Sequence, residues 1–179
     1  PSLEESLADK RMLLEQTRLL EREQNPWSGR RIVQFHGNRA LVVEPPAEPL
    51  SAQELDRVYE LPFTRMPHPA YREPIPAHIM IKDSITVVRG CCGGCSFCGL
   101  GLHQGRFITS RTTNSVLREI SVLSGTKQFR GTITDLGGPT ANLSGCRNGQ
   151  NKACRQCHRP SCLFPAICPH FETDAAPLL

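Results

Sequence analysis

All nine cysteines of this 179-residue chain lie between Cys91 and Cys168, so the first 90 residues contain none. An odd number of cysteines confined to one half does not suit a disulfide framework, in which paired cysteines brace the whole fold. The N-terminus is charged where a secretory signal would need an apolar core. We therefore expect a cytoplasmic protein whose thiols stay reduced and whose clustered cysteines bind metal.

The composition, 39% apolar and 21% charged, is that of an ordinary soluble chain. Its longest apolar runs are about four residues, whereas a membrane-spanning helix needs about 20, so no contact with a membrane is expected. Residues 1–98 carry 12 basic and 13 acidic side chains, and residues 99–179 carry 9 and 4. The cysteine-rich half is therefore basic, which suits an anionic ligand, thiolates around iron, or nucleic acid. Because the chain lacks an initiating methionine, we expect it to be a segment of a longer one.

Residues 1–76 predict an N-terminal region with a helix, a hairpin and a proline-rich linker. A serine followed three residues later by glutamate forms a capping box at the start of two predicted helices, over residues 2–24 and 51–60. Two β-rich runs around a Gly-Asn pair predict a hairpin over residues 31–43. Five prolines within residues 61–76 predict an extended tether at a domain boundary.

Residues 77–145 have the pattern of a βαβ unit and are predicted to begin the core domain. A buried strand at 84–89 precedes a helix at 113–124 and a second strand at 129–136. Such units form parallel sheets, and their ligand sites lie at the C-terminal ends of the strands. The first cysteine loop and a Gly-Gly pair both occupy such ends. The helix is expected to bury one apolar face, formed by Val116, Leu117, Ile120 and Leu123.

The loop after the first strand, RGCCGGCSFCG, places Cys91, Cys95 and Cys98 in a C-x3-C-x2-C pattern. Three thiolates on one tight loop suit three irons of a [4Fe-4S] cluster, and the loop glycines relieve the strain of wrapping around it. The fourth iron would keep an open position, as catalytic metal sites do. Cys92 adjoins Cys91, and since neighbouring residues rarely point at the same cluster, we do not expect it to be a ligand.

The three-cysteine loop, with Phe97 before its last cysteine, resembles the signature of the radical S-adenosylmethionine (SAM) enzymes. Further motifs extend the resemblance over nearly the whole chain to the YgiQ-type family of uncharacterised radical SAM proteins: EPPAEPLSAQELDRVYELPFTR, HPAY, HQGRFITSR and DLGGPTAN. This chain departs from the family pattern at Cys92, where an aromatic residue is more usual, and at Glu44, where asparagine is.

The resemblance implies an α/β fold, namely the βαβ start of a partial (β/α) radical SAM barrel. It implies that the open iron binds SAM, whose reductive cleavage yields a 5′-deoxyadenosyl radical, with a flavodoxin or ferredoxin as electron donor. The substrate and the catalytic residues that act on it are not identified. Such a barrel needs on the order of 200 residues, and only 81 follow Cys98. We therefore expect this segment not to turn over a substrate by itself.

The resemblance also assigns cofactor-binding roles to individual residues. Phe97 would lie near the adenine, and the bare backbone of Gly137 and Gly138 would approach the methionine amino group. Asp135 would orient that amino group or cap the turn. No corrinoid motif occurs in the chain, so no cobalamin is expected.

A second cysteine group gives residues 146–179 the character of a metal-binding segment. Five cysteines lie within 23 residues, among basic side chains that would lower their pKa values. The resemblance assigns a second site to four of them and leaves Cys154 as an extra; the site would hold another [4Fe-4S] cluster or zinc. These ligands are Cys146, Cys157, Cys162 and Cys168.

Two other functions fit part of the pattern. The C-x2-C pairs ending at Cys98 and Cys157 would suit a zinc-stabilised module that binds nucleic acid or protein, but the 55 residues between the pairs exceed the usual spacing. A pure electron carrier would use four protein ligands rather than three. Arg106 and Arg111 are expected either to meet a carboxylate or to lie solvated at the surface.

Overall fold

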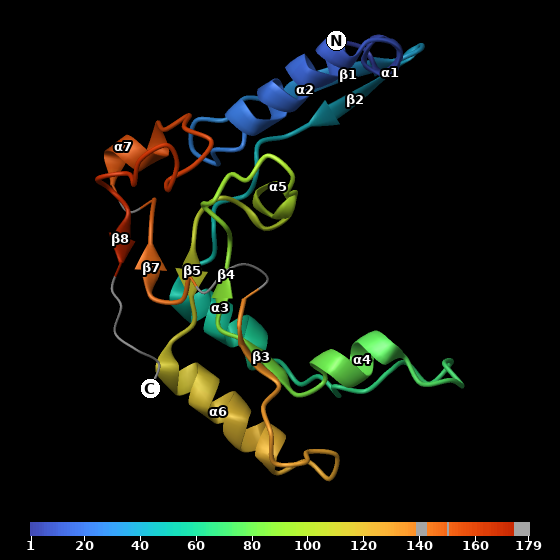
Figure 1. Ribbon diagram of the computed structural model, residues 1–179, viewed down its shortest axis with the longest axis vertical. Helices are drawn as coiled ribbons and strands as arrows, with labels where there is room; N and C mark the ends of the chain where they lie inside the picture. The colour runs from blue at the N-terminus through green and yellow to red at the C-terminus, as the bar shows by residue number, and fades with distance from the viewer. Residues whose placement is uncertain (139–142, 150, 174–179) are drawn as a thin grey trace. The chain divides into compact units, whose positions relative to one another are not determined.

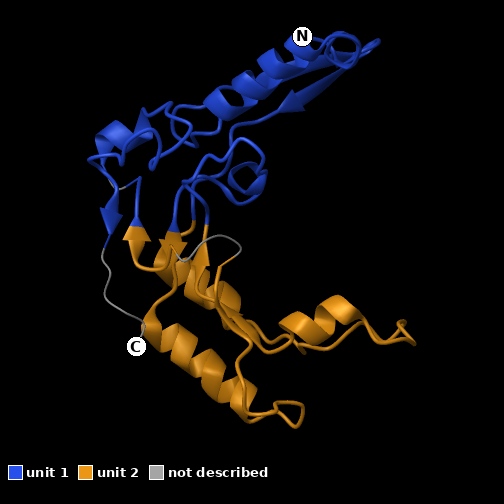
Figure 2. Ribbon diagram, in the orientation of Figure 1, with its two compact units in different colours: residues 1–49, 90–108, 147–173 blue, residues 50–89, 109–146, 174–179 orange. Residues whose placement is uncertain are grey.

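The computed structural model describes residues 1–138, 143–149 and 151–173 (Figure 1). The described residues form two compact units, each assembled from separate stretches of the chain (Figure 2). Unit 1 combines residues 1–49, 90–108 and 147–173, and it contains the first cysteine loop. Unit 2 combines residues 50–89 and 109–146, and it contains the Gly-Gly pair.

The N-terminal part of unit 1 contains two helices where the sequence predicted one. They are α1 (Leu3–Ala8) and α2 (Lys10–Arg22), and Asp9 separates them in an extended conformation. The Asp9 side chain accepts a hydrogen bond from the Arg11 N–H at 2.8 Å, so it caps α2 instead of continuing α1. The capping box of Ser2 and Glu5 is present as predicted. The prediction of one continuous helix over residues 2–24 was therefore wrong at Asp9.

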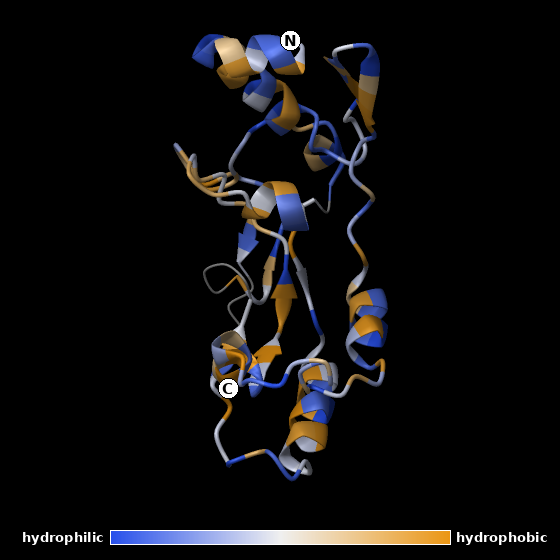
Figure 3. Cartoon of the chain, turned by 90° about the vertical axis from the view of Figure 1, so that its right-hand side faces the viewer, coloured by the Kyte–Doolittle hydropathy of each residue, from blue (hydrophilic) through white to orange (hydrophobic). Residues whose placement is uncertain are grey.

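The predicted hairpin forms from β1 (Ile32–His36) and β2 (Arg39–Val43), which pair in antiparallel register. Helices α1 and α2 contact β1 and the turn, where the Gly37 N–H donates to Glu4 Oε1 at 2.8 Å and Gln16 bonds to Gln34. The α2 helix carries hydrophilic and hydrophobic residues together (Figure 3), and none of them is fully buried.

The remaining elements of unit 1 are short. They are α5 (Leu100–Gln104), α7 (Lys152–Arg155) and β8 (Glu172–Thr173), while β7 (Cys146–Arg147) lies at the boundary of the units. Asn25 is fully buried and holds the cysteine-rich segment, because its amide donates to the carbonyls of Cys154 and Cys157 at 2.9 and 3.0 Å. Few regular elements order this segment, so side-chain contacts of this kind fix it.

Unit 2 contains the predicted βαβ pattern with shorter strands than expected. Residues 84–89 form two strands, β3 (Ser84–Thr86) and β4 (Val88–Arg89), and β3 pairs in parallel with β6 (Asp135–Gly137). Of the strand expected over residues 129–136, only the last two residues are in β6, which also includes Gly137. Strand β4 pairs with β5 (Thr109–Ser110) in antiparallel fashion. Within the described residues the sheets have two strands each, and no closed barrel forms.

Three helices accompany these strands in unit 2. They are α3 (Ala52–Tyr59), which begins at the predicted capping box, α4 (Pro76–Ile81), which the sequence did not predict, and α6 (Thr113–Ser124). Val116 and Leu123 of α6 are buried as expected, but Leu117 is 56% exposed, so the predicted apolar face is narrower. Thr112 caps the start of α6, and Asp56 of α3 holds it by accepting from its hydroxyl at 2.6 Å and from its N–H at 3.0 Å.

A buried ion network fixes α6 in unit 2. Glu119 bonds both Arg65 and Arg111, whose side chain is completely buried. Of the two alternatives given for Arg111, the structure shows a carboxylate partner, Glu119, and not the solvated surface position. No helix in the described ranges is long and apolar enough to cross a bilayer.

Candidate functional site

The first cysteine loop begins directly after β4 and folds back onto two other segments of unit 1. The Cys91 N–H donates to the Gly105 carbonyl at 3.0 Å, and the Cys162 N–H donates to the Cys92 carbonyl at 3.0 Å. Gly94 has a φ of +61°, and a Cβ there would overlap the carbonyl group of Pro160. The loop therefore requires glycine at this position, because backbone from the cysteine-rich segment fills the space of a side chain.

Two of the three predicted cluster ligands point their sulfurs at the same region. A Cβ added at Gly93 would lie 3.5 Å from the Cys91 sulfur and 3.6 Å from the Cys95 sulfur, so both thiols flank one space that glycine leaves open. A turn follows, in which the Cys98 N–H donates to the Cys95 carbonyl at 3.0 Å. Three thiols on one loop are the donor set that iron–sulfur clusters use, and the residues fit such a group.

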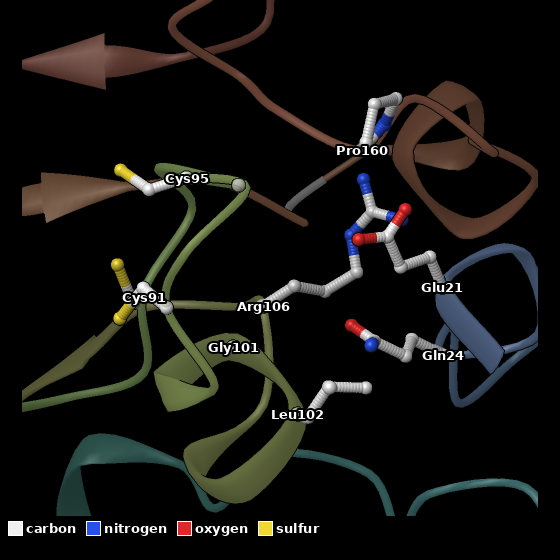
Figure 4. A pocket seen from close by; sticks show the side chains of 10 residues that line it. Glu21, Gln24, Cys91, Cys95, Gly101, Leu102, Arg106 and Pro160 are labelled. Atoms are coloured by element: carbon white, nitrogen blue, oxygen red, sulfur yellow. The ribbon is translucent and has the colours of Figure 1, made fainter. Parts of the chain in front are cut away.

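The structure does not bring the complete ligand set to one point. In the ranges that the structure describes, no three side chains of His, Cys, Asp or Glu converge as metal ligands. Beside the loop lies a small cavity of about 50 Å³. Arg106, Glu21 and Gln24 enter it, whereas the sulfurs of Cys91 and Cys95 lie at its far side (Figure 4). A space of this size is much smaller than the several hundred Å³ of a cofactor pocket.

Cys92, which the sequence predicted to be a bystander in cluster binding, contacts a cysteine of the second group. Cys92 is 2% exposed, and its backbone carbonyl accepts from the Cys162 N–H at 3.0 Å. The neighbouring Cys92 thiol lowers the pKa of Cys162, and the amide of Asn148 and the charges of Arg106 and Arg159 lower it further. The Cys162 thiol and burial raise the pKa of Cys92.

The predicted ligands of the second site are divided between the two units. Cys157 and Cys168 lie in unit 1 with Cys162, and the Cys168 N–H donates to the Cys162 carbonyl at 2.8 Å. The Arg159 N–H donates to the Cys157 sulfur at 3.4 Å. Cys146 belongs to unit 2, where burial raises the pKa of its thiol.

The predicted SAM-contacting residues also divide between the units. In unit 1, Phe97 is 91% exposed. In unit 2, Gly137 ends β6, and its carbonyl accepts from the Val87 N–H at 2.7 Å. A Cβ at Gly138 would lie 2.5 Å from a Val88 methyl group and 3.0 Å from its carbonyl oxygen, so only glycine fits there. The residues 139–142 of the same motif lie outside the described residues.

Sequence reasoning missed two buried asparagines that support the site. Asn148 is 3% exposed; its side chain accepts from the Ile108 N–H at 2.8 Å and donates to the Arg106 carbonyl at 2.9 Å. Arg106, expected at a carboxylate or at the surface, is instead buried and donates to the Arg159 carbonyl. The second asparagine is Asn25, described above. The backbone carbonyls that accept from these two amide nitrogens lie 42 or more residues away, so no local pattern indicates the contacts.

Comparison with known proteins identifies the family. The family model described as Radical SAM N-terminal matches residues 1–84. The chain is 45% identical to a UPF0313 protein of Bacteroides thetaiotaomicron over 99% of its length, and 49% identical to one of Geobacter sulfurreducens over 96%. It is also 45% identical to the UPF0313 protein YgiQ of Escherichia coli, in an alignment that covers 100% of this chain.

The chain spans 29%, 28% and 24% of these three relatives, so it corresponds to about a quarter of their length. No solved structure matches it. The family model covers the N-terminal half, and the relatives cover the cysteine loop, the Gly-Gly pair and the second cysteine group as well. The chain therefore belongs to the UPF0313 family of YgiQ-type radical SAM proteins.

Proposed function

We propose that this chain is the cluster-carrying part of a radical SAM enzyme, in which Cys91, Cys95 and Cys98 hold a [4Fe-4S] cluster. The observation that carries the proposal is the position of the Cys91 and Cys95 sulfurs on either side of the space above Gly93. Membership of the family supports the same assignment for Cys98, which follows on the next turn of the loop.

When bound, a [4Fe-4S] cluster with one open iron supplies the electron that cleaves SAM to methionine and a 5′-deoxyadenosyl radical. The three thiolates hold the cluster, and Gly93 leaves room for it beside the sulfurs of Cys91 and Cys95. The exposed ring of Phe97 is available for stacking on adenine, and Gly137 and Gly138 offer backbone without side chains to the methionine moiety. The side chain of Asp135 would orient the SAM amino group or cap the turn.

The second cysteine group would bind a second cluster or a zinc ion through Cys146, Cys157, Cys162 and Cys168. A bound metal would stabilise a segment whose described part contains few regular elements. We place the protein in the cytoplasm, where thiols stay reduced, with a flavodoxin or ferredoxin as electron donor. We expect substrate turnover only from the whole protein, because the relatives are about four times as long as this chain.

Anaerobic reconstitution of the chain with iron and sulfide tests the proposal. The wild-type chain should bind about four irons at the first site, or about eight if the second group also takes a cluster. SAM should shift the electron paramagnetic resonance signal of the reduced sample. Cys95→Ala should lose the first cluster, whereas Cys92→Ser, a matched change on the same loop, should retain it.

Equal loss of iron in both variants would overturn the assignment of ligands. An iron-free chain that binds only zinc would instead favour the zinc-stabilised module for nucleic acid or protein. If the chain bound about four irons and one zinc, we would assign the zinc to the second cysteine group.

A further inference from the structure

One cavity of unit 2 has the size of a small-molecule site. It lies between the segment that follows α3 and one face of α6, and both belong to unit 2 (Figure 2). Its volume is about 630 Å³, and ligand pockets usually have volumes of about 300 to 1,000 Å³. The described residues that line it include none of those proposed for the clusters or SAM.

The helical period of α6 places its contribution to the cavity on one face. Counted from the first of them, the lining residues lie three, four, seven and eight positions along the helix; they are Ser115, Arg118, Glu119, Val122 and Leu123. The opposite segment contributes Leu61 and Phe63. Leu61, Phe63 and Val122 are each more than half exposed. Large apolar side chains thus border one cavity while still in contact with solvent, and an apolar ligand would cover them.

The charged residues that line the cavity do not balance. They are three arginines and two glutamates: Arg65, Arg111, Arg118, Glu60 and Glu119. Arg118 pairs with Glu60 in an exposed ion pair. Arg65 and Arg111 instead share the one carboxylate of Glu119, in surroundings that are mostly buried. The excess of one positive charge therefore lies where water screens it weakly, and it attracts an anion more strongly than a surface arginine would.

The hydrogen bonds of Arg111 leave part of its charge unsatisfied. Its terminal nitrogens donate to the Thr86 carbonyl at 2.9 Å, to the Ser115 hydroxyl at 2.8 Å and to Glu119. Its Nε is buried and has no hydrogen-bond partner among the residues that the structure describes. An unpaired donor on a buried charged group is costly, so a negative charge in the cavity would stabilise this arginine.

We propose that this cavity binds a small organic carboxylate with an apolar body. The carboxylate faces the arginines, and the apolar body packs against Phe63 and Val122. A single carboxylate matches the excess of one positive charge, whereas a phosphate group carries up to about two negative charges at pH 7. Binding requires neither iron nor SAM, so the site goes beyond the proposed function and does not depend on it.

Isothermal titration calorimetry of the reduced, metal-free chain tests the proposal, with octanoate as the probe. Octanoate should bind with a Kd of about 1 mM or below. Octanamide, a neutral molecule of nearly the same shape, should bind about tenfold more weakly, because it lacks the charge. Phe63→Ala removes part of the apolar wall and should weaken both probes by a similar factor, about fivefold.

Charge changes on α6 test the location of the site. Val122→Glu adds a carboxylate to the cavity wall and should weaken octanoate binding about threefold to fivefold. Val122→Gln, which has the same shape without the charge, should bind octanoate more tightly than Val122→Glu does. Leu117→Glu adds the same charge on α6 outside the cavity and should leave binding unchanged. Both positions are more than half exposed, so these variants should keep the fold.

Equal binding of octanoate and octanamide would overturn the anion site, and so would equal losses in Val122→Glu and Leu117→Glu. If octanoate did not bind at millimolar concentration, the proposal would be wrong, and the cavity would be left to another part of the longer protein. The first cluster is tested separately, by iron binding to Cys95→Ala.

Discussion

Replacing Gly94 by alanine should loosen the contact between the cluster loop and the segment at Pro160. Gly94 has a φ of +61°, and its added Cβ would lie 2.9 Å from the Pro160 carbonyl carbon and 3.1 Å from the Ser161 Cβ. Carbon atoms in favourable contact lie about 3.5 to 4.0 Å apart. Backbone surrounds the site, so neither partner can rotate away.

Two terms contribute to the expected loss of stability. The left-handed backbone conformation costs a residue with a Cβ about 1 to 2 kcal/mol. Forcing an extra carbon into a filled space costs about 1 to 3 kcal/mol more, because the backbone must shift. The free energy of unfolding should therefore fall by about 2 to 5 kcal/mol.

The assay is urea denaturation of the reduced, metal-free chain, followed by the fluorescence of Trp27. This is the single tryptophan of the chain, and it packs edge-on against Phe107 in the same unit, with ring centres 4.8 Å apart. The matched control is Gly37→Ala, because Gly37 has a φ of +58° and its Cβ would meet no atom closer than 4.0 Å. The control should lose only about 1 to 2 kcal/mol. Equal losses in both variants would refute the steric argument.

Two further predictions concern buried carboxylates. The hydrogen bond from Arg30 lowers the pKa of Glu23 from 4.5 to about 2, so its stabilisation is complete above about pH 5 and is lost as the pH falls toward 2. Glu23→Gln should flatten that part of an acid titration followed by tryptophan fluorescence; an unchanged slope would contradict the assignment. Glu119→Gln leaves the guanidinium of Arg111 buried without a full counter-charge and should destabilise unit 2 by about 3 to 5 kcal/mol. Circular dichroism during urea denaturation measures the loss, and Glu60→Gln, in an exposed ion pair, should change stability by less than about 1 kcal/mol.

Local signals predicted many of the elements well. The capping boxes at Ser2 and Ser51, the hairpin turn at Gly37 and the helix over residues 113–124 all form as expected. Each of these depends on residues within four or five positions of one another, so the sequence contains the complete signal. The errors arose where two local signals competed, as at Asp9, which was read as part of a helix and instead caps the next one.

The candidate site was likewise predicted where it depends on a local pattern, and it was not predicted where distant segments meet. The spacing of Cys91, Cys95 and Cys98 is a local pattern, and with the neighbouring motifs it was sufficient to identify the family. The sequence also predicted three consecutive regions, whereas the chain forms two units from interleaved segments. This interleaving places Gly94 against Pro160 and Cys92 against Cys162.

By itself, the sequence determined the family, the βαβ pattern and the cysteines available for metal, because these depend on residue type and short spacing. Only the tertiary structure decided which buried groups are paired. Asn25, Asn148 and Arg106 are polar residues that local patterns leave at the surface, and each is buried because its partners arrive from distant parts of the chain. A buried polar group needs such partners to offset its desolvation, and no local pattern specifies where they lie.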